Sequence, residues 1–275
     1  MSHSDYFVPY SVSDEGMKDL DEEILLTQVR VWGHWLDKEM QLSASRKVEF
    51  SPAHLHRLSC LLPCYRDRFA KPKPEISWAE QIKAMYENAL RDPVRFRYEW
   101  QAKPSLEIGP EEMEKAIRSR RSIRHFRKEK ISRTLLLKLI DCARWAPTNC
   151  NQQSLRFIVV GDPIVLRQLE KGGMRGGMSP CVIATVADLR FYGENDAESP
   201  AHDSGAALEN LLLMAHAHGL GACYTSSRHV NCDLHRAILK VKDYEKITAL
   251  VWLGYYDSHP ISPAIREIEE IVQFL

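Results

Sequence analysis

The sequence has no excess of charge of either sign, since its 275 residues include 37 lysines and arginines and 37 aspartates and glutamates. A chain without net charge has no long-range field that attracts nucleic acid or an anionic membrane, so we expect neither as a partner. Long apolar runs are also missing, because residues 208–220, the longest candidate, contain Glu209, Asn210, His216 and His218. We therefore expect no transmembrane helix.

The sequence also has little that directs it out of the cell. Residues 1–10 include polar and acidic residues and contain no apolar core of a signal peptide. The seven cysteines are an odd number without framework spacing, which is typical of reduced thiols in a chain that needs no disulfides. These features predict a cytoplasmic protein.

What is present is an ordinary globular composition, with 44% hydrophobic and 27% charged residues. The length suffices for one α/β domain with a substantial extension. Residues 1–105 show helical periodicity and little strand signal, whereas the pattern becomes regular after the prolines at 104 and 110. We therefore predict a mostly helical N-terminal extension over residues 1–105 and a main domain over residues 106–275.

Several local patterns predict helices in the extension. Leu25, Val29, Trp32 and Leu36 recur at helical spacing. Residues 77–80, Ser-Trp-Ala-Glu, have the pattern of a capping box and predict that a helix begins there. Prolines at 52, 63, 72 and 74 favour short helices joined by irregular turns in the stretch between these two predicted helices.

The main domain alternates between helical and strand patterns. Pro110 can begin a helix in which Met113 and Ile117 form a buried stripe, and Ser132 can cap the next one. A long helix follows Asp203 and ends before the glycine at 219. Strands are expected at residues 155–160, 181–187, 222–226 and 247–256. This alternation predicts an α/β or α+β fold, a sheet covered by helices.

Residues 118–126 contain the densest basic cluster, with arginines at 118, 120, 121 and 124 and serines at 119 and 122. A guanidinium group can donate two parallel hydrogen bonds to two oxygens of one phosphate, and a hydroxyl adds a further donor. The cluster therefore indicates a site for one small phosphate group. A solvated basic helix end, which the helix dipole favours, is the other interpretation of the same residues.

Residues 146–153, Ala-Pro-Thr-Asn-Cys-Asn-Gln-Gln, form a second polar cluster between an expected helix and an expected strand. Amide side chains both donate and accept hydrogen bonds, so they can bind the edge of a planar heterocycle that has carbonyl and NH groups. An ordinary polar loop is the alternative.

The order of these segments resembles the nitroreductase family. The matching segments are residues 120–126, 143–148, 151–153 with the following strand, 203–207, 219–223 and 247–256. The resemblance implies a three-layer fold, a sheet with helices on both faces, and an interlocked homodimer that holds FMN at its interface. The long N-terminal region makes the chain resemble an extended member of the family.

Carried over to this sequence, the resemblance implies two groups of cofactor-binding residues. The phosphate and ribityl chain of FMN would be held by Arg120, Arg121, Ser122 and Arg124, with Arg266 closing on the phosphate. The isoalloxazine ring would be contacted by a loop, usually from the other subunit, and by a segment near its N5 edge. The loop residues are Pro147, Thr148, Asn149, Asn151 and Gln153, and the segment is Tyr224, Thr225 and Ser226.

The resemblance further implies an FMN-dependent oxidoreductase that passes hydride from NAD(P)H through flavin N5 to a small nitro, quinone or related acceptor. The flavin carries the chemistry, so no protein nucleophile is expected. The family's usual Pro-Trp after this loop is replaced by Ser154 and Leu155. Two alternatives therefore stay open. One is oxidation, dehalogenation or flavin fragmentation of a dedicated biosynthetic substrate, and the other is a non-catalytic binding module.

Two further segments contain residue types that occur in binding sites. His54, His56, Cys60 and Cys64 offer soft ligands at helical spacing, but no second pair stands near and the two histidines would face different ways, so we predict no metal site. The glycine-rich residues 171–178 precede a strand and fit no nucleotide fingerprint. We expect them to form a loop over the flavin site or a plain surface loop.

Overall fold

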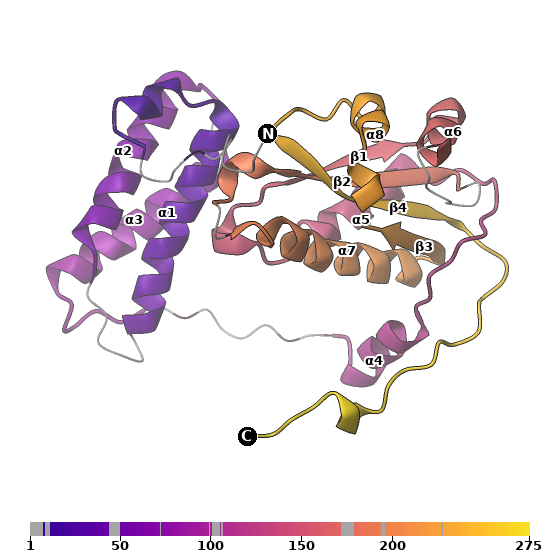
Figure 1. The fold of residues 1–275 in the computed structure, drawn as a ribbon. Helices are drawn as coiled ribbons and strands as arrows, with labels where there is room; N and C mark the ends of the chain where they lie inside the picture. The colour runs from indigo at the N-terminus through magenta and orange to yellow at the C-terminus, as the bar shows by residue number, and fades with distance from the viewer. Residues whose placement is uncertain are drawn as a thin grey trace.

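The computed structural model describes residues 8, 12–43, 50–71, 73–98, 100, 105, 107–171, 179–193, 196–226 and 228–275. A group of N-terminal helices lies beside a sheet with helices on both faces (Figure 1). Within this part of the chain, no helix has the length and apolarity needed to cross a membrane. Residues 172–178 of the predicted loop at 171–178 lie outside the described residues, as do residues 104 and 106 of the expected boundary.

Helices α1 (Glu22–Ser43), α2 (Pro52–Arg68) and α3 (Pro74–Arg91) share one apolar core and follow the short 3-10 helix η2 (Gly16–Asp19). Leu25, Val29 and Leu36 are fully buried, as their spacing predicts, while Trp32 is partly buried. Gly33 allows α1 and α3 to approach, because a Cβ there would lie 2.6 Å from the ring of Trp78.

Two local predictions in this region are wrong. Helix α3 begins at Pro74 with Lys73 as its N-cap, so residues 77–80 lie inside it and form no capping box. Proline suits the first helical position, whose N–H needs no partner, and it moves the start upstream. Helix α2 runs unbroken through Pro63, since its buried Leu58 and Leu61 offset the hydrogen bond that proline removes.

The sheet has the strand order β1-β2-β4-β3, and all neighbouring strands are antiparallel. Its strands are β1 (Leu155–Val160), β2 (Cys181–Asp188), β3 (Leu220–Thr225) and β4 (Glu245–Tyr255). The two central strands are buried along almost their whole length, whereas β1 and β3 form the two edges. The expected strands are confirmed to within two residues at each end.

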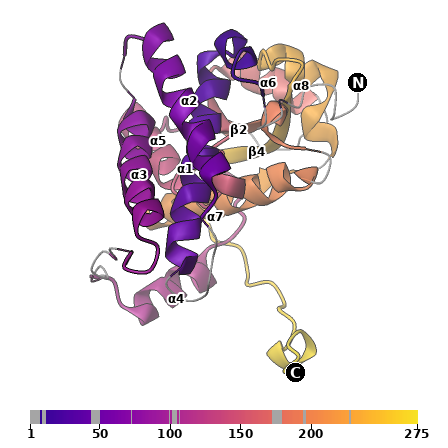
Figure 2. The ribbon, with the colours of Figure 1, turned by 90° about the vertical axis from the view of Figure 1, so that its left-hand side faces the viewer.

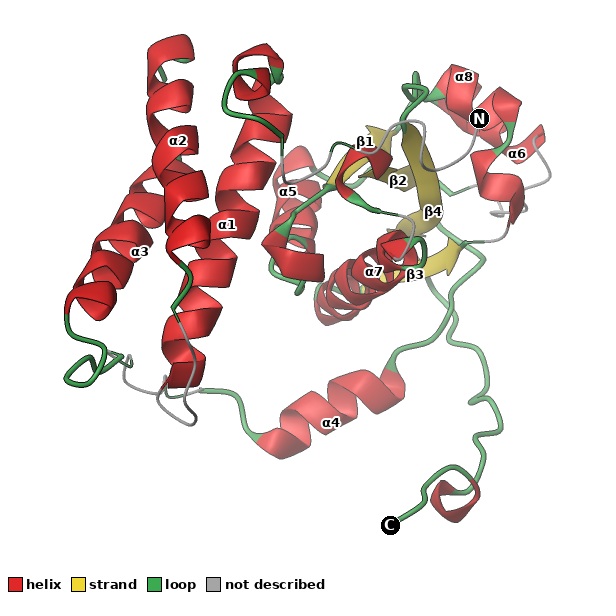
Figure 3. Ribbon diagram, turned by 60° about the vertical axis from the view of Figure 1, so that its left-hand side comes forward, coloured by secondary structure: helices red, strands yellow, loops and turns green. Residues whose placement is uncertain are grey.

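Side chains alternate along β2 between two apolar layers, which explains why helices cover both faces. One layer holds Ile183 and the helices α5 (Arg133–Ala143) and α7 (Ser199–Ala217). The other holds Val182 and Ala184 with α6 (Pro163–Lys171) and α8 (Asp233–Ile238). Figure 3 shows these helices on either side of the strands, and the three-layer α+β fold is confirmed.

Helix α4 (Pro110–Ser119) and the C-terminal residues 256–275 extend from this body, with one 3-10 turn, η7 (Ile268–Glu270), near the end. Figure 2 shows the C-terminal segment leaving the sheet as an extended arm. The predicted buried stripe of α4 is wrong for the single chain, because Met113 and Ile117 are 43% and 51% exposed.

Candidate functional site

The amide-rich loop lies between α5 and β1 and contains the 3-10 turn η3 (Asn149–Asn151). Cys150, Asn151 and Gln153 adopt left-handed φ angles of 45°, 55° and 55°. Such angles are costly for residues with a side chain, so surrounding contacts must hold the loop. Thr148 supplies two of them: its carbonyl oxygen accepts from the Asn151 N–H at 3.1 Å, and its Oγ1 accepts from the Gln153 N–H at 3.2 Å.

Asp203, in α7, holds the loop from one side. Its Oδ1 accepts the backbone N–H of Asn149 at 2.9 Å, and its Oδ2 accepts the hydroxyl of Tyr192 at 2.8 Å. Tyr192 in turn contacts the hydroxyl of Ser154. Asp203 is 5% exposed, and this burial raises the pKa of its carboxyl above the ordinary value.

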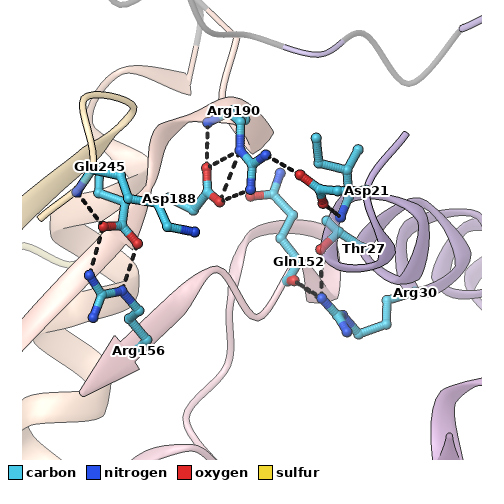
Figure 4. A network of polar contacts seen from close by, with 10 residues as sticks. Asp21, Thr27, Arg30, Gln152, Arg156, Asp188, Arg190 and Glu245 are labelled. Atoms are coloured by element: carbon cyan, nitrogen blue, oxygen red, sulfur yellow. Dashed lines mark hydrogen bonds and ion pairs between the residues drawn. The ribbon is translucent and has the colours of Figure 1, made fainter. Parts of the chain in front are cut away.

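Arg30, in α1, holds the loop from the other side. Its Nε and Nη2 lie 3.2 and 3.0 Å from the carbonyl oxygen of Gln152, to which both donate. Its remaining donors bind Thr27 Oγ1 at 2.6 Å and Glu75 Oε1 at 3.1 Å. The N-terminal helices are therefore joined directly to the amide-rich loop (Figure 4).

A second contact of the same kind fixes α1 beside the sheet. Arg190, after β2, binds Asp188 Oδ2 at 2.6 Å and Asp21 Oδ2 at 2.5 Å, and Asp21 stands at the start of α1. Burial lowers the pKa of Arg190, but the two carboxylates outweigh it and keep the pKa above its usual range. Figure 4 shows this network beside the pair that Arg156 forms with Glu245.

The basic cluster lies at the opposite edge of the sheet. The Ile123 N–H donates to the Ala222 carbonyl at 3.0 Å, so Ser122 forms a parallel bridge with Ala222 of β3. Gly221 permits this close approach, because a Cβ there would lie 2.7 Å from side-chain atoms of Ile123. In this parallel direction Arg124 and Tyr224 each lie two residues beyond the bridge, whereas Arg120 and Arg121 precede it; Thr225 ends β3 and Ser226 follows it.

The guanidinium groups of this cluster differ in their contacts. Arg124 is exposed, Arg120 lies 3.3 Å from Glu209 Oε1, and Arg121 donates to Ser262 Oγ at 2.5 Å. The Nε of Arg121 is buried and has no hydrogen-bond partner within the described chain. Burial first, and then the positive charges of His259, Arg120 and Arg121, lower the pKa of His216. The arginines here therefore offer guanidinium donors to an anion.

The two predicted halves of the site do not meet within one chain. The loop of Pro147, Thr148, Asn149, Asn151 and Gln153 precedes β1, whereas the basic cluster borders β3. Three strand spacings of about 4.8 Å separate these edges by roughly 14 Å. Arg266 stays in the C-terminal arm, where its Nε lies 3.2 Å from Glu270 Oε2.

The family model described as the nitroreductase family matches residues 117–172 and 174–255, half of the chain. The chain belongs to the nitroreductase family. The match covers the sheet, the basic cluster and the amide-rich loop, and it leaves out the N-terminal helices α1–α3.

Individual relatives agree with this membership. A protein of Archaeoglobus fulgidus, provisionally named NADH dehydrogenase/NAD(P)H nitroreductase, is 31% identical over 150 residues, which are 53% of this chain and 86% of that protein. The FMN-dependent nitroreductase of Clostridium difficile R20291 is 25% identical, with a TM-score of 0.50, over 58% of this chain and 96% of its own. A nitroreductase-like protein of Bacillus cereus shares the fold, with a TM-score of 0.54 at 18% identity over 64% and 99% of the two chains.

The sequence analysis did not identify Arg30, which holds the amide-rich loop. One signal was available: Arg30 lies between Val29 and Val31 on a helix that is otherwise apolar at this point, and all three are buried. A buried arginine requires a partner. Its partner, a main-chain carbonyl 122 residues away, leaves no mark in a sequence pattern.

Proposed function

We propose that this protein is an FMN-dependent oxidoreductase that uses NAD(P)H to reduce a small organic acceptor such as a quinone or a nitro compound. Its membership of the nitroreductase family supports the coarser part of this proposal, an oxidoreductase. One observation supports the finer assignment most: the segment that carries Arg120, Arg121 and Arg124 is bridged to β3 at Ala222, two residues before Tyr224, which suits a molecule with both a phosphate and a ring.

The residues present fit FMN. Arg120 and Arg124 offer guanidinium donors to a phosphate, and the buried Nε of Arg121 is a donor still to be satisfied within the described chain. Thr148 and Gln153 line a surface pocket with the apolar Leu155 and Phe157, which suits one side of a planar ring.

When bound, FMN supplies hydride transfer at N5, from the nicotinamide and on to the acceptor. The protein positions the flavin and supplies the polar groups around it. The arginine cluster binds the phosphate, while the amides of Asn151 and Gln153 bind the polar edge of the ring. The outer side of β3, an edge strand, offers main-chain groups of residues 224–226 to the same ring.

The proposal includes a homodimer, in which each flavin site is built from both subunits. The loop before β1 and the cluster beside β3 are at opposite edges of one sheet, so a second copy must bring its loop to the cluster. The apolar side chains exposed on α4 and on the C-terminal arm provide the contact surface; Ile261 is 92% and Phe274 94% exposed. Apolar surface of this extent is typical of a protein interface.

The bond between Arg30 and the loop favours a second candidate, the oxidation or reductive conversion of a dedicated biosynthetic substrate. A general reductase needs no additional domain bonded to its ring-binding loop. An enzyme for one dedicated substrate gains from such a domain an additional surface that can line its substrate pocket. Under this alternative, the same flavin site reacts slowly with simple quinones.

Steady-state turnover tests the proposal and separates the candidates. The protein loaded with FMN should oxidise NADH or NADPH in the presence of a simple quinone or nitroaromatic, and omission of the acceptor should lower the rate. Flavin reduction by NAD(P)H without acceptor turnover would favour the dedicated substrate. Failure of the protein to retain FMN at all would contradict both candidates.

A further inference from the structure

Three side chains with metal-binding chemistry meet at the outer surface of the N-terminal helices. His56 and Cys60 are one turn apart on α2, and Asp14 comes from the segment that precedes η2. The Nε2 of His56 lies 3.6 Å from Cys60 Sγ and 3.6 Å from Asp14 Oδ2. All three ligand atoms lie within 4.8 Å of one another.

These separations suit a tetrahedral zinc ion. With Zn–S near 2.3 Å and Zn–N and Zn–O near 2.0 Å, tetrahedral angles place a nitrogen about 3.6 Å from a sulfur and about 3.3 Å from an oxygen. The imidazole and the thiol already have the first separation, and the separation of His56 Nε2 from Asp14 Oδ2 exceeds the second by a few tenths of an ångström. Imidazole, thiolate and carboxylate are all ligands that Zn²⁺ accepts.

The charges around the cluster are consistent with a cation between the ligands. The carboxylate of Asp14 lies within 4.8 Å of the Cys60 sulfur, so a cation bound there would stand between two ligands that both carry negative charge when they bind a metal. Arg57 binds Asp14 through the other carboxylate oxygen, Oδ1, at 3.3 Å. This leaves Oδ2 toward His56 and holds the carboxylate in place, as outer-shell partners of metal ligands do.

We propose that Asp14, His56 and Cys60 bind one Zn²⁺ ion, with water as the fourth ligand, and so tie residues 12–19 to α2. His54 takes no part, since its Nδ1 lies 2.6 Å from Glu39 Oε1 on another face of the helix. Cys64 is one turn beyond Cys60, but its thiol donates to the Met17 carbonyl at 3.6 Å. The sequence alone predicts no metal site here. The third ligand, Asp14, is 42 residues from His56 in the sequence, so local spacing does not reveal it.

Cobalt substitution tests the site in the full-length chain, independently of any flavin reaction. Co²⁺ is added to chelator-treated, reduced protein, and the spectrum before addition is subtracted so that bound flavin cancels. We expect visible bands of tetrahedral Co²⁺ and a near-ultraviolet thiolate charge-transfer band that saturate together at one ion per chain. Added Zn²⁺ should remove both.

Two cysteine variants provide the matched comparison. Cys60→Ser should abolish the charge-transfer band, whereas Cys64→Ser, on the same helix face, should retain it. His56→Ala should remove the tetrahedral bands. Absence of a charge-transfer band in the unmodified chain, or a band that survives Cys60→Ser, would overturn the proposal and leave a solvated ion pair between His56 and Asp14.

Discussion

The guanidinium group of Arg30 donates two hydrogen bonds, of 3.2 and 3.0 Å, to the main-chain carbonyl oxygen of Gln152. Arg30 belongs to the N-terminal helices, and Gln152 belongs to the loop that we assign to the flavin ring. Because the Arg30 side chain is only 8% exposed, the contact is shielded from water. The extension is thus built onto the loop and does not merely precede the nitroreductase sheet.

Replacement of Arg30 by methionine should destabilise the protein by about 2–4 kcal/mol, because the buried Gln152 carbonyl and Glu75 lose their donor. The loop would also lose one of its anchors, so we expect FMN retention to fall. Urea unfolding and the flavin content after gel filtration measure the two effects. Arg66→Met on α2, whose ion pair with Glu80 is exposed, is the control and should change neither. Equal effects of both variants would argue against a specific role for Arg30.

Asp203 should give the protein an unusual dependence of stability on pH. Its carboxyl pKa is raised in the folded state, mainly by burial. A raised pKa means that the protonated form is favoured by folding, so this contribution is present at low pH and is lost as pH rises through the folded-state pKa. Relative to Asp203→Asn, the unmodified chain should therefore gain stability on going from neutral to mildly acidic pH. Denaturant unfolding of both proteins at the two pH values measures this, and a loss instead of a gain would contradict it.

The arginine cluster should control FMN affinity. Arg120→Ala and Arg124→Ala should each weaken FMN binding by about tenfold or more, because a charge-assisted hydrogen bond contributes roughly 1.5–3 kcal/mol. Quenching of FMN fluorescence gives the dissociation constants. Arg118→Ala removes a neighbouring arginine that pairs with Glu114 on the solvent face of α4, and it should leave the affinity unchanged.

The C-terminal arm should be needed for dimerisation. Deletion of residues 263–275 leaves the bond between Arg121 and Ser262 in place and removes Ile265, Phe274 and other exposed apolar side chains. We expect the shortened chain to sediment as a folded monomer with weakened FMN binding, since each site would lack the partner's loop. A truncated chain that remains dimeric and retains flavin would place the interface elsewhere.

Much of the fold was predictable, since strands such as Cys181–Asp188 are continuous apolar runs and the helix ending at Ala217 is followed by a glycine with φ of 71°. Helix starts were less predictable, because Pro74 competes with the capping pattern three residues later. For α4, periodicity identified an apolar stripe correctly but could not say whether this chain or another covers it.

The candidate site was likewise only partly predictable from the sequence. The arginine cluster and the amide loop were visible as dense polar segments, and Arg120 and Gln153 were identified through the order of family motifs. The separation of the two clusters by the width of the sheet depends on strand order, which no single segment encodes. Arg30 and Asp203 act through main-chain groups, whose chemistry is the same at every residue, so their partners could not be identified from sequence.

The anaerobic absorption spectrum of the purified protein, recorded with FMN and then with NADPH and NADH, tests the central claim most directly. We predict that FMN remains bound through gel filtration and that its visible bands bleach when a reduced nicotinamide is added, then return when a quinone is added. A protein that binds no FMN even from excess would contradict the account, because the arginine cluster would then have no flavin phosphate to bind.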